Sequence, residues 1–148
     1  MTGRASRDER RQHYGWWTRI ASRWADCDAY GHVNNAIYYS WFDTALTTMA
    51  IERGVLRAPG QTSIGLCIAS GCEFLAPIGF PETVEVGVRI GRIGNSSLRY
   101  ELAIFAGTES PAAVGHFTHV FVDAATRKGV PLTDQQKAAI ADLLASGV

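Results

Sequence analysis

Residues 36–53 form the segment that most constrains the fold of this chain. The segment, AIYYSWFDTALTTMAIER, runs for 18 residues without Gly or Pro, which is enough for a helix about 27 Å long. Apolar side chains occur nearly all round it, and such a helix is surrounded by the rest of its domain. Asn34 or Asn35 suits the N-cap position, and Gly54 suits the C-terminal stop. The sequence therefore predicts one long helix at the centre of the domain.

The segments after this helix alternate between apolar and polar residues with the period of a β-strand. In residues 83–93, for example, Val84, Val86, Val88 and Ile90 fall on one face. Short turns between such segments indicate an antiparallel meander with one face on the core. We expect strands at residues 64–75, 83–93, 97–105 and 112–123, and an earlier strand at residues 14–25.

A short C-terminal helix is predicted to start near Thr133, because Thr133 and Gln136 have the spacing of a capping box. The predicted order is one strand, the long helix, four strands and the short helix. One central apolar helix with one antiparallel sheet makes an α+β domain in which the sheet curls around the helix.

Length and charge exclude several classes of protein. A chain of 148 residues has room for one domain, which we place at residues 14–148, after a flexible, solvated tail at residues 1–13. Lys plus Arg and Asp plus Glu both number 14, but six arginines lie in the first 23 residues, so the remaining body is mildly acidic. This balance argues against a nucleic-acid-binding domain.

No segment of the sequence indicates membrane insertion or secretion. The longest stretch without a charged residue, 58–72, has 15 residues and is too short and too polar to span a bilayer. The N-terminal residues lack the apolar core of a signal peptide. Three cysteines without metal or redox spacing favour free thiols in a reducing compartment. We therefore expect a soluble, cytoplasmic protein.

The candidate site of chemistry is the segment before the long helix. Residues 24–39, WADCDAYGHVNNAIYY, place two carboxylates, an imidazole and two carboxamides around the predicted helix start. A helix start offers unpaired N–H groups and the positive end of the helix dipole, and such a place can stabilise an oxyanion. Asp28 lies seven residues before Asn35, and a carboxylate there could activate water or attack a carbonyl itself.

This segment resembles the DxDxxGHVNNxxY signature of acyl-CoA thioesterases with the hotdog fold, the 4-hydroxybenzoyl-CoA thioesterase-like group. Residues 26–28 (DCD) and 31–35 (GHVNN) match the signature as they stand, and Tyr38 follows. The resemblance extends over roughly residues 16–135. It implies the hotdog fold, an antiparallel sheet wrapped around one long central helix.

The resemblance implies roles for the matching residues. Asp28 would be the catalytic carboxylate, either as nucleophile or as general base on water, and the backbone N–H of Asn35 would polarise the thioester carbonyl. His32 would have a role in the active site or would be a loop histidine without one. Substrate contacts are expected from Gly31, Asn34, Tyr38, Arg92 and Ser97.

The resemblance also implies partners. The substrate would be an acyl-CoA, whose coenzyme A is part of the substrate, and no separate cofactor is expected. The protein would be a homo-oligomer, a dimer or a dimer of dimers, with sites at subunit interfaces and strands paired between subunits.

Some of these residues, and two histidines later in the chain, also have a purely structural interpretation. Asp28 could cap the loop through an Asx turn, and Asp26 suits a structural hydrogen bond within the loop. His116 and His119 do not suit a metal site, because residues three apart in a strand point to opposite faces.

Three functions remain open at this point. The first is hydrolysis of an acyl-CoA to the free acid and CoA, and the second is hydrolysis of an acyl-carrier-protein thioester. The third is binding of acyl-CoA without catalysis. A hotdog dehydratase or hydratase would need a different arrangement of His with Asp or Glu, which the sequence does not show.

Overall fold

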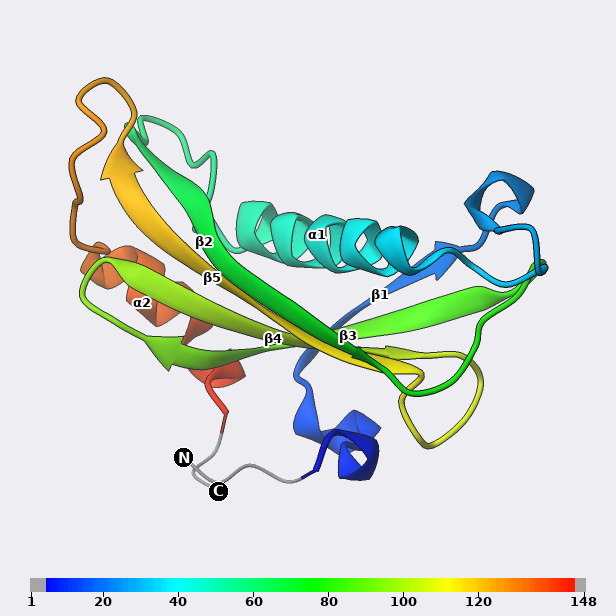
Figure 1. Cartoon of the computed structure of the whole chain (residues 1–148). Helices are drawn as coiled ribbons and strands as arrows, with labels where there is room; N and C mark the ends of the chain where they lie inside the picture. Colours follow the sequence, from blue (N-terminus) through cyan, green and yellow to red (C-terminus); the bar gives the residue numbers. More distant parts are fainter. Residues whose placement is uncertain (1–4, 146–148) are drawn as a thin grey trace.

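The computed structural model describes residues 5–145, which form one antiparallel sheet with a long helix across one of its faces (Figure 1). The predicted long helix and the five predicted strands are present, and two strands have the predicted bounds. The first strand is shorter than predicted, because the chain turns into a 3-10 helix at Trp24–Asp26. The elements are β1 (Trp16–Ala21), α1 (Asn35–Glu52), β2 (Ser63–Phe74), β3 (Thr83–Ile93), β4 (Ser97–Phe105), β5 (Ala113–Asp123) and α2 (Asp134–Ile140).

The strand order is β1-β3-β4-β5-β2, and every neighbouring pair is antiparallel. The predicted meander is confirmed for β3, β4 and β5 but is wrong for β2, which pairs with β5 at the edge of the sheet. The connection at residues 75–82 is longer than the loop of about two to five residues that joins most hairpins. In addition, β3 already has β1 and β4 as its two neighbours. One side of β2 is therefore without a partner strand in the described chain.

Helix α1 lies over β1, β3 and β4 and buries one side against the sheet. The opposite side, which the sequence predicted to be covered as well, is exposed in the single chain at Asp43, Thr44 and Thr48. These positions carry polar side chains, which explains why one chain can leave them in water. The buried residues are spaced by three and four positions and are Tyr38, Trp41, Phe42, Ala45, Leu46, Met49 and Ala50.

The ends of both helices follow the predicted capping rules. Asn34 is the N-cap of α1, and its side-chain oxygen accepts a hydrogen bond from the Ala36 N–H at 2.9 Å. Gly54 follows the end of α1 with a φ of +75°, the left-handed conformation that glycine adopts readily. At α2, Thr133 and Gln136 form the predicted capping box. The position of the α1 N-terminus is therefore well determined by local sequence.

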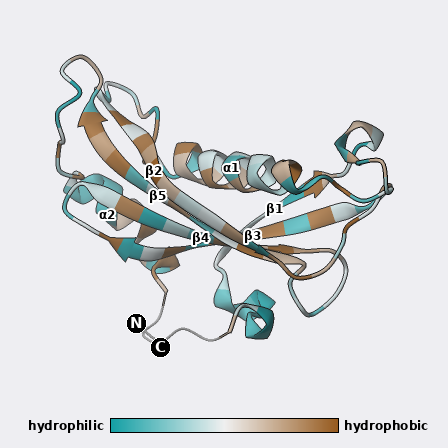
Figure 2. Cartoon of the chain, viewed as in Figure 1, coloured by the Kyte–Doolittle hydropathy of each residue, from teal (hydrophilic) through white to brown (hydrophobic). Residues whose placement is uncertain are grey.

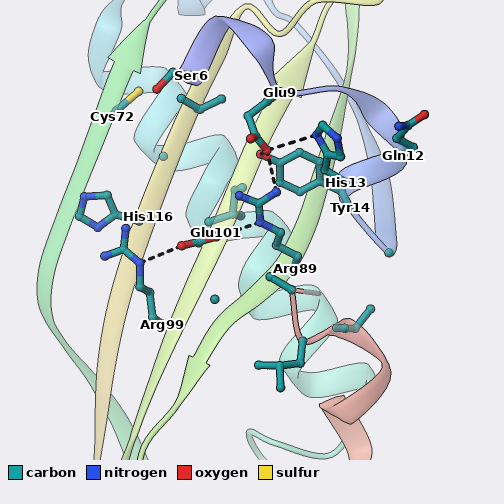
Figure 3. A pocket seen from close by; sticks show the side chains of 18 of the residues that line it. Ser6, Glu9, Gln12, His13, Tyr14, Cys72, Arg89, Arg99, Glu101 and His116 are labelled. Carbon is teal, nitrogen blue, oxygen red and sulfur yellow. Dashed lines mark hydrogen bonds and ion pairs between the residues drawn. The ribbon is translucent and has the colours of Figure 1, made fainter. Parts of the chain in front are cut away.

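Residues 5–13 lie against the outer face of the sheet, which is the face away from α1 (Figures 1 and 3). The sequence predicts a solvated tail here, but Glu9 is buried. Its carboxylate pairs with Arg89 at 2.6 Å and accepts a hydrogen bond from the Tyr14 hydroxyl at 2.9 Å. Arg89 also pairs with Glu101 at 2.8 Å. The segment is hydrophilic (Figure 2), and only the folded sheet brings its partners to it; residues 1–4 of the predicted tail lie outside the described residues.

Two buried polar side chains lie on the face of the sheet that α1 covers. The Tyr100 hydroxyl and the His119 Nδ1 have no hydrogen-bond partner within residues 5–145, and their ring centroids are 5.0 Å apart. Burial lowers the pKa of His119, and the opposing effect of Asp43 is smaller. The imidazole is therefore held in its neutral form.

Replacing Glu9 by Gln is expected to destabilise the protein, because Arg89 then keeps only one carboxylate partner in a largely buried place. We expect the free energy of unfolding to fall by about 1–3 kcal/mol in denaturant titrations. The control is Asp8→Asn, an exposed neighbour, for which a change within about 0.5 kcal/mol is expected. Equal stability of the two variants would contradict the packing of residues 5–13 on the sheet.

Acid is expected to destabilise the fold through His119. The unfolded chain binds a proton there with a pKa of about 6.5, whereas the folded chain binds it only at lower pH. This contribution to stability is therefore complete above about pH 6.5 and is lost as the pH falls below it. Thermal unfolding at several pH values should show a smaller loss for His119→Gln than for the wild type; equal losses would contradict the burial of a neutral imidazole.

Candidate active site

The loop between β1 and α1 is a narrow turn that ends at the start of the helix. Cys27 and Val33 pair in an isolated antiparallel bridge, and the Asp28 N–H donates a hydrogen bond to the His32 carbonyl oxygen at 2.8 Å. Gly31 has a φ of +80°, a backbone conformation that residues other than glycine rarely adopt. The turn therefore holds Asp28 close to the residues that begin α1.

Asp28 uses one carboxylate oxygen to shape this turn. Its Oδ1 accepts hydrogen bonds from the backbone N–H groups of Tyr30 at 2.8 Å and His32 at 3.3 Å. This is the Asx turn that the sequence left open as a structural alternative. The Oδ2 atom accepts no hydrogen bond from another residue of the described chain. The structural and the chemical interpretation are compatible, because they use different oxygens.

The first turn of α1 presents a backbone donor beside this carboxylate. Asn34 uses its side chain as the N-cap, and Asn35 is the first helical residue. Within residues 5–145, no acceptor is hydrogen-bonded to the Asn35 N–H, as is usual for the first N–H groups of a helix. The helix dipole adds partial positive charge at the same place. The Asn35 N–H can therefore bind an oxygen that carries developing negative charge.

A groove of about 370 Å³ brings four predicted site residues together. Asp28, His32, Asn35 and Tyr38 line it. Gly31 and Asn34 shape the same turn but do not line the groove. The remaining lining residues are Val33, Phe74, Leu75, Ala76 and Pro77.

Tyr38 contacts the opposite side of the groove, where residues 74–77 form its second wall. Its side chain is buried, and its ring meets the Phe74 ring edge-on with 5.1 Å between the centroids. Burial is the main cause that raises the pKa of Tyr38, so the hydroxyl keeps its proton at neutral pH. His32, in contrast, is exposed, and its ring makes no hydrogen bond within the described residues. Its imidazole is therefore accessible from solvent beside Asp28.

Arg92 and Ser97 lie far from this groove in the same chain. They flank the turn between β3 and β4, at the end of the sheet opposite to the start of α1 (Figure 1). Neither lines the groove. Arg92 stands directly opposite Arg99 in the register of the two strands, so two like charges are neighbours on one face.

The second wall of the groove, residues 74–77, was not among the predicted site residues. The sequence carried a weak signal for it, because residues 74–78 (FLAPI) lie within the stretch of roughly residues 16–135 over which the chain resembles the family. A hydrogen bond from the Val33 N–H to the Ile78 carbonyl oxygen at 2.7 Å joins this wall to the turn that carries Asp28. This contact joins residues 45 positions apart, and no local pattern could have predicted it.

A larger cavity of about 840 Å³ lies on the outer face of the sheet (Figure 3). It contains Glu9, Arg89, Glu101, Arg99 and His116, but none of the predicted site residues. The carboxylates and guanidinium groups there pair with one another, and such pairing is structural. No group of three or more metal-ligating side chains occurs within residues 5–145. The groove beside α1 is therefore the candidate active site.

Comparison with known proteins identifies the family of this chain. Residues 22–140 match the model of the thioesterase-like superfamily. The chain belongs to the thioesterase-like superfamily. The resemblance found in the sequence is thereby confirmed, and the protein is a thioester hydrolase. No helix of this thioesterase within residues 5–145 is long and apolar enough to cross a bilayer.

Solved structures resemble the thioesterase over most of its length. The PA5185 protein from Pseudomonas aeruginosa strain PAO1 is 44% identical, with a TM-score of 0.87 over 94% of this chain and 98% of that chain. The PA2801 protein of the same species, a predicted thioesterase, is 31% identical, with a TM-score of 0.76 over 84% and 96%. Slr0204, a 1,4-dihydroxy-2-naphthoyl-CoA thioesterase from Synechocystis, is 17% identical, with a TM-score of 0.74 over 86% and 96%, which shows a shared fold.

Proposed function

We propose that the protein hydrolyses an acyl-CoA thioester to the free carboxylic acid and CoA. The observation that carries this proposal is the groove that contains both the Asp28 carboxylate and the start of α1 at Asn35. The Asn35 N–H would bind the thioester carbonyl oxygen and stabilise the negative charge that develops there. The Asp28 Oδ2, which accepts no hydrogen bond in the described chain, would face the carbonyl carbon.

Two routes use these groups, and both end in the same products. As general base, Asp28 removes a proton from water, the hydroxyl oxygen bonds to the carbonyl carbon, and the C–S bond breaks. As nucleophile, its carboxylate oxygen displaces the thiolate and forms a mixed anhydride, which water then cleaves. In either route the departing sulfur takes up a proton as the CoA thiol. Neither route needs a cofactor besides the coenzyme A of the substrate, and His32 would assist proton transfer at the groove.

We propose further that the active form is a homo-oligomer. Strand β2 is at the edge of the sheet, and its exposed side chains include Leu66 and Ile68, the latter 62% exposed. An exposed apolar edge strand is a template for pairing with another chain. A second copy on β2 would also cover the exposed side of α1 and add a wall to the groove. A dimer or a dimer of dimers would complete the site in this way.

Within such an oligomer, Arg92 and Ser97 would contact the coenzyme A part of a substrate bound to a neighbouring subunit. The strand register supports this assignment: Arg92 lies opposite Arg99, and Arg99 is already paired with Glu101 at 3.0 Å, so Arg92 is the guanidinium group there that can bind a further anion. The phosphates of coenzyme A supply such an anion. Tyr38, Gly31 and Asn34 would contact or shape the acyl and pantetheine part near Asp28.

Replacing Asp28 by Asn is expected to lower kcat by about 10²–10⁴-fold, because the carboxylate supplies the base or the nucleophile. The measurement is release of CoA thiol from a panel of acyl-CoA substrates. Glu109→Gln, a change in an exposed loop, is the control and should match the wild type. Equal turnover by wild type and Asp28→Asn would refute the mechanism. Binding of acyl-CoA by the wild type without thiol release would favour a non-catalytic binding protein, and cleavage of acyl carrier protein alone would favour the carrier substrate.

Replacing Arg92 by Ala is expected to raise the KM for acyl-CoA about fivefold, because an effect of this size corresponds to the loss of one exposed ion pair. The KM for the matching acyl-pantetheine, which lacks the nucleotide, should stay unchanged. Lys128→Ala, another exposed cation, is the control and should leave both values unchanged. If Arg92→Ala raises both values equally, or neither, Arg92 has no contact with the phosphates.

A further inference from the structure

Asp26 is a buried carboxylate directly before the turn that carries Asp28. Arg23 donates three hydrogen bonds to it, and we call this contact the Arg23–Asp26 clamp. The Asp26 side chain is 1% exposed. Its Oδ2 accepts the Arg23 backbone N–H at 2.8 Å, and its Oδ1 accepts Nε at 3.0 Å and Nη2 at 2.6 Å. The Arg23 side chain itself is 72% exposed, so these bonds hold Asp26 in place without burying a second charge. The hydrogen bonds from Arg23 lower the pKa of Asp26, which keeps the clamp charged at neutral pH.

The backbone of Asp26 connects this clamp to the start of α1. Its carbonyl oxygen accepts the Asn34 N–H at 2.8 Å, and its own N–H donates to the Arg23 carbonyl oxygen at 2.9 Å. Asn34 is the residue before Asn35, and Asp28 follows Asp26 by two positions. The orientation of the Asp26 peptide therefore sets how the Asp28 carboxylate and the Asn35 N–H lie relative to each other.

The same segment also holds the second wall of the groove. Ser22 is buried, and its hydroxyl donates to the Gly79 carbonyl oxygen at 3.1 Å and accepts the Glu82 N–H at 2.9 Å. The Ser22 N–H donates to the Glu82 carbonyl oxygen at 2.7 Å. Residues 22–26 therefore join the turn that carries Asp28 to the connection at residues 75–82 through the hydrogen bonds of one short segment.

We propose that Asp26, through its clamp with Arg23, is a positioning residue for the hydrolysis: it holds the Asp28 carboxylate and the Asn35 N–H in the geometry that the reaction needs. This inference rests on the proposed function. Asp26 does not line the groove and touches no reacting atom. A displacement of about 1 Å between reacting groups can cost about 100-fold in rate, so a loosened clamp would reduce turnover although both catalytic groups remain.

The kinetic test compares Asp26→Asn and Arg23→Ala with the wild type. We expect kcat to fall by about 10–100-fold while KM stays within about twofold, because the side chains that line the groove and the Ser22 bonds to its second wall are not mutated. Arg23→Lys should recover part of the loss, since it keeps the charge but loses the two-atom contact. The matched control is Arg19→Ala, an exposed arginine of β1, which should behave as the wild type. Wild-type turnover by Asp26→Asn and Arg23→Ala would overturn the inference.

A double variant separates positioning from a general loss of structure. In an Asp28→Asn background, adding Asp26→Asn should cause a smaller proportional loss of the residual rate than it causes in the wild type, because only the Asn35 N–H is left to be positioned. Equal proportional losses in both backgrounds, accompanied by equal falls in Tm, would mean that Asp26 is only structural and would overturn the inference. If instead Asp28→Asn turns over like the wild type, the proposed mechanism fails, whatever the effect of Asp26→Asn.

A second measurement does not depend on activity. The Asn34 N–H is bonded to the Asp26 carbonyl oxygen, so its hydrogen exchange by NMR reports on the clamp directly. We expect exchange at Asn34 to become at least about tenfold faster in Asp26→Asn and Arg23→Ala and to stay unchanged in Arg19→Ala. Unchanged protection in the two clamp variants would overturn the inference even if no thioester were cleaved by the wild type.

Discussion

The packing of α1 on the sheet is the interaction on which the rest of this structure depends. One face of the helix, from Tyr38 to Ala50, meets the inward-facing apolar residues of β3 and β4. Full burial of a single large apolar side chain stabilises a fold by about 1.5–3 kcal/mol, and this contact buries many of them. Because the helix cannot slide without breaking these contacts, its N-terminus has a defined place above the sheet, and with it the Asn35 N–H.

The candidate site combines a group from this rigid helix with a group from a turn. The Asn35 N–H takes its position from α1, whereas Asp28 takes its position from hydrogen bonds within residues 26–34. The Asp28 Oδ1 atom accepts the hydrogen bonds that hold the turn. These bonds limit the rotation of the carboxylate and leave Oδ2 available to a substrate or water. The buried Asp26 side chain and the Val33 contact to Ile78 attach the turn to the surrounding structure. A turn attached at several points loses little entropy when a substrate binds, which favours precise placement of the reacting groups.

The surfaces that the single chain leaves open lie next to the groove. The groove is bordered by Phe74 and Leu75, both exposed at the end of the edge strand β2. The polar side of α1 is open as well. A homo-oligomer would bury them and add a wall to the groove.

Local sequence patterns predict the helices, the strands and the turn that carries Asp28. Helix ends at Asn34 and Gly54, the alternation of β3 and β4, and the Asp28 turn depend on residues a few positions apart, so their patterns are visible in the chain. Three further features become visible only in the folded chain: β2 lies at the edge beside β5, Glu9 is buried by Arg89, and residues 74–77 form the second wall of the groove. These features depend on contacts between residues far apart in the chain. Periodicity and capping carry no information about such contacts, because they describe how each segment folds and not which segment it meets.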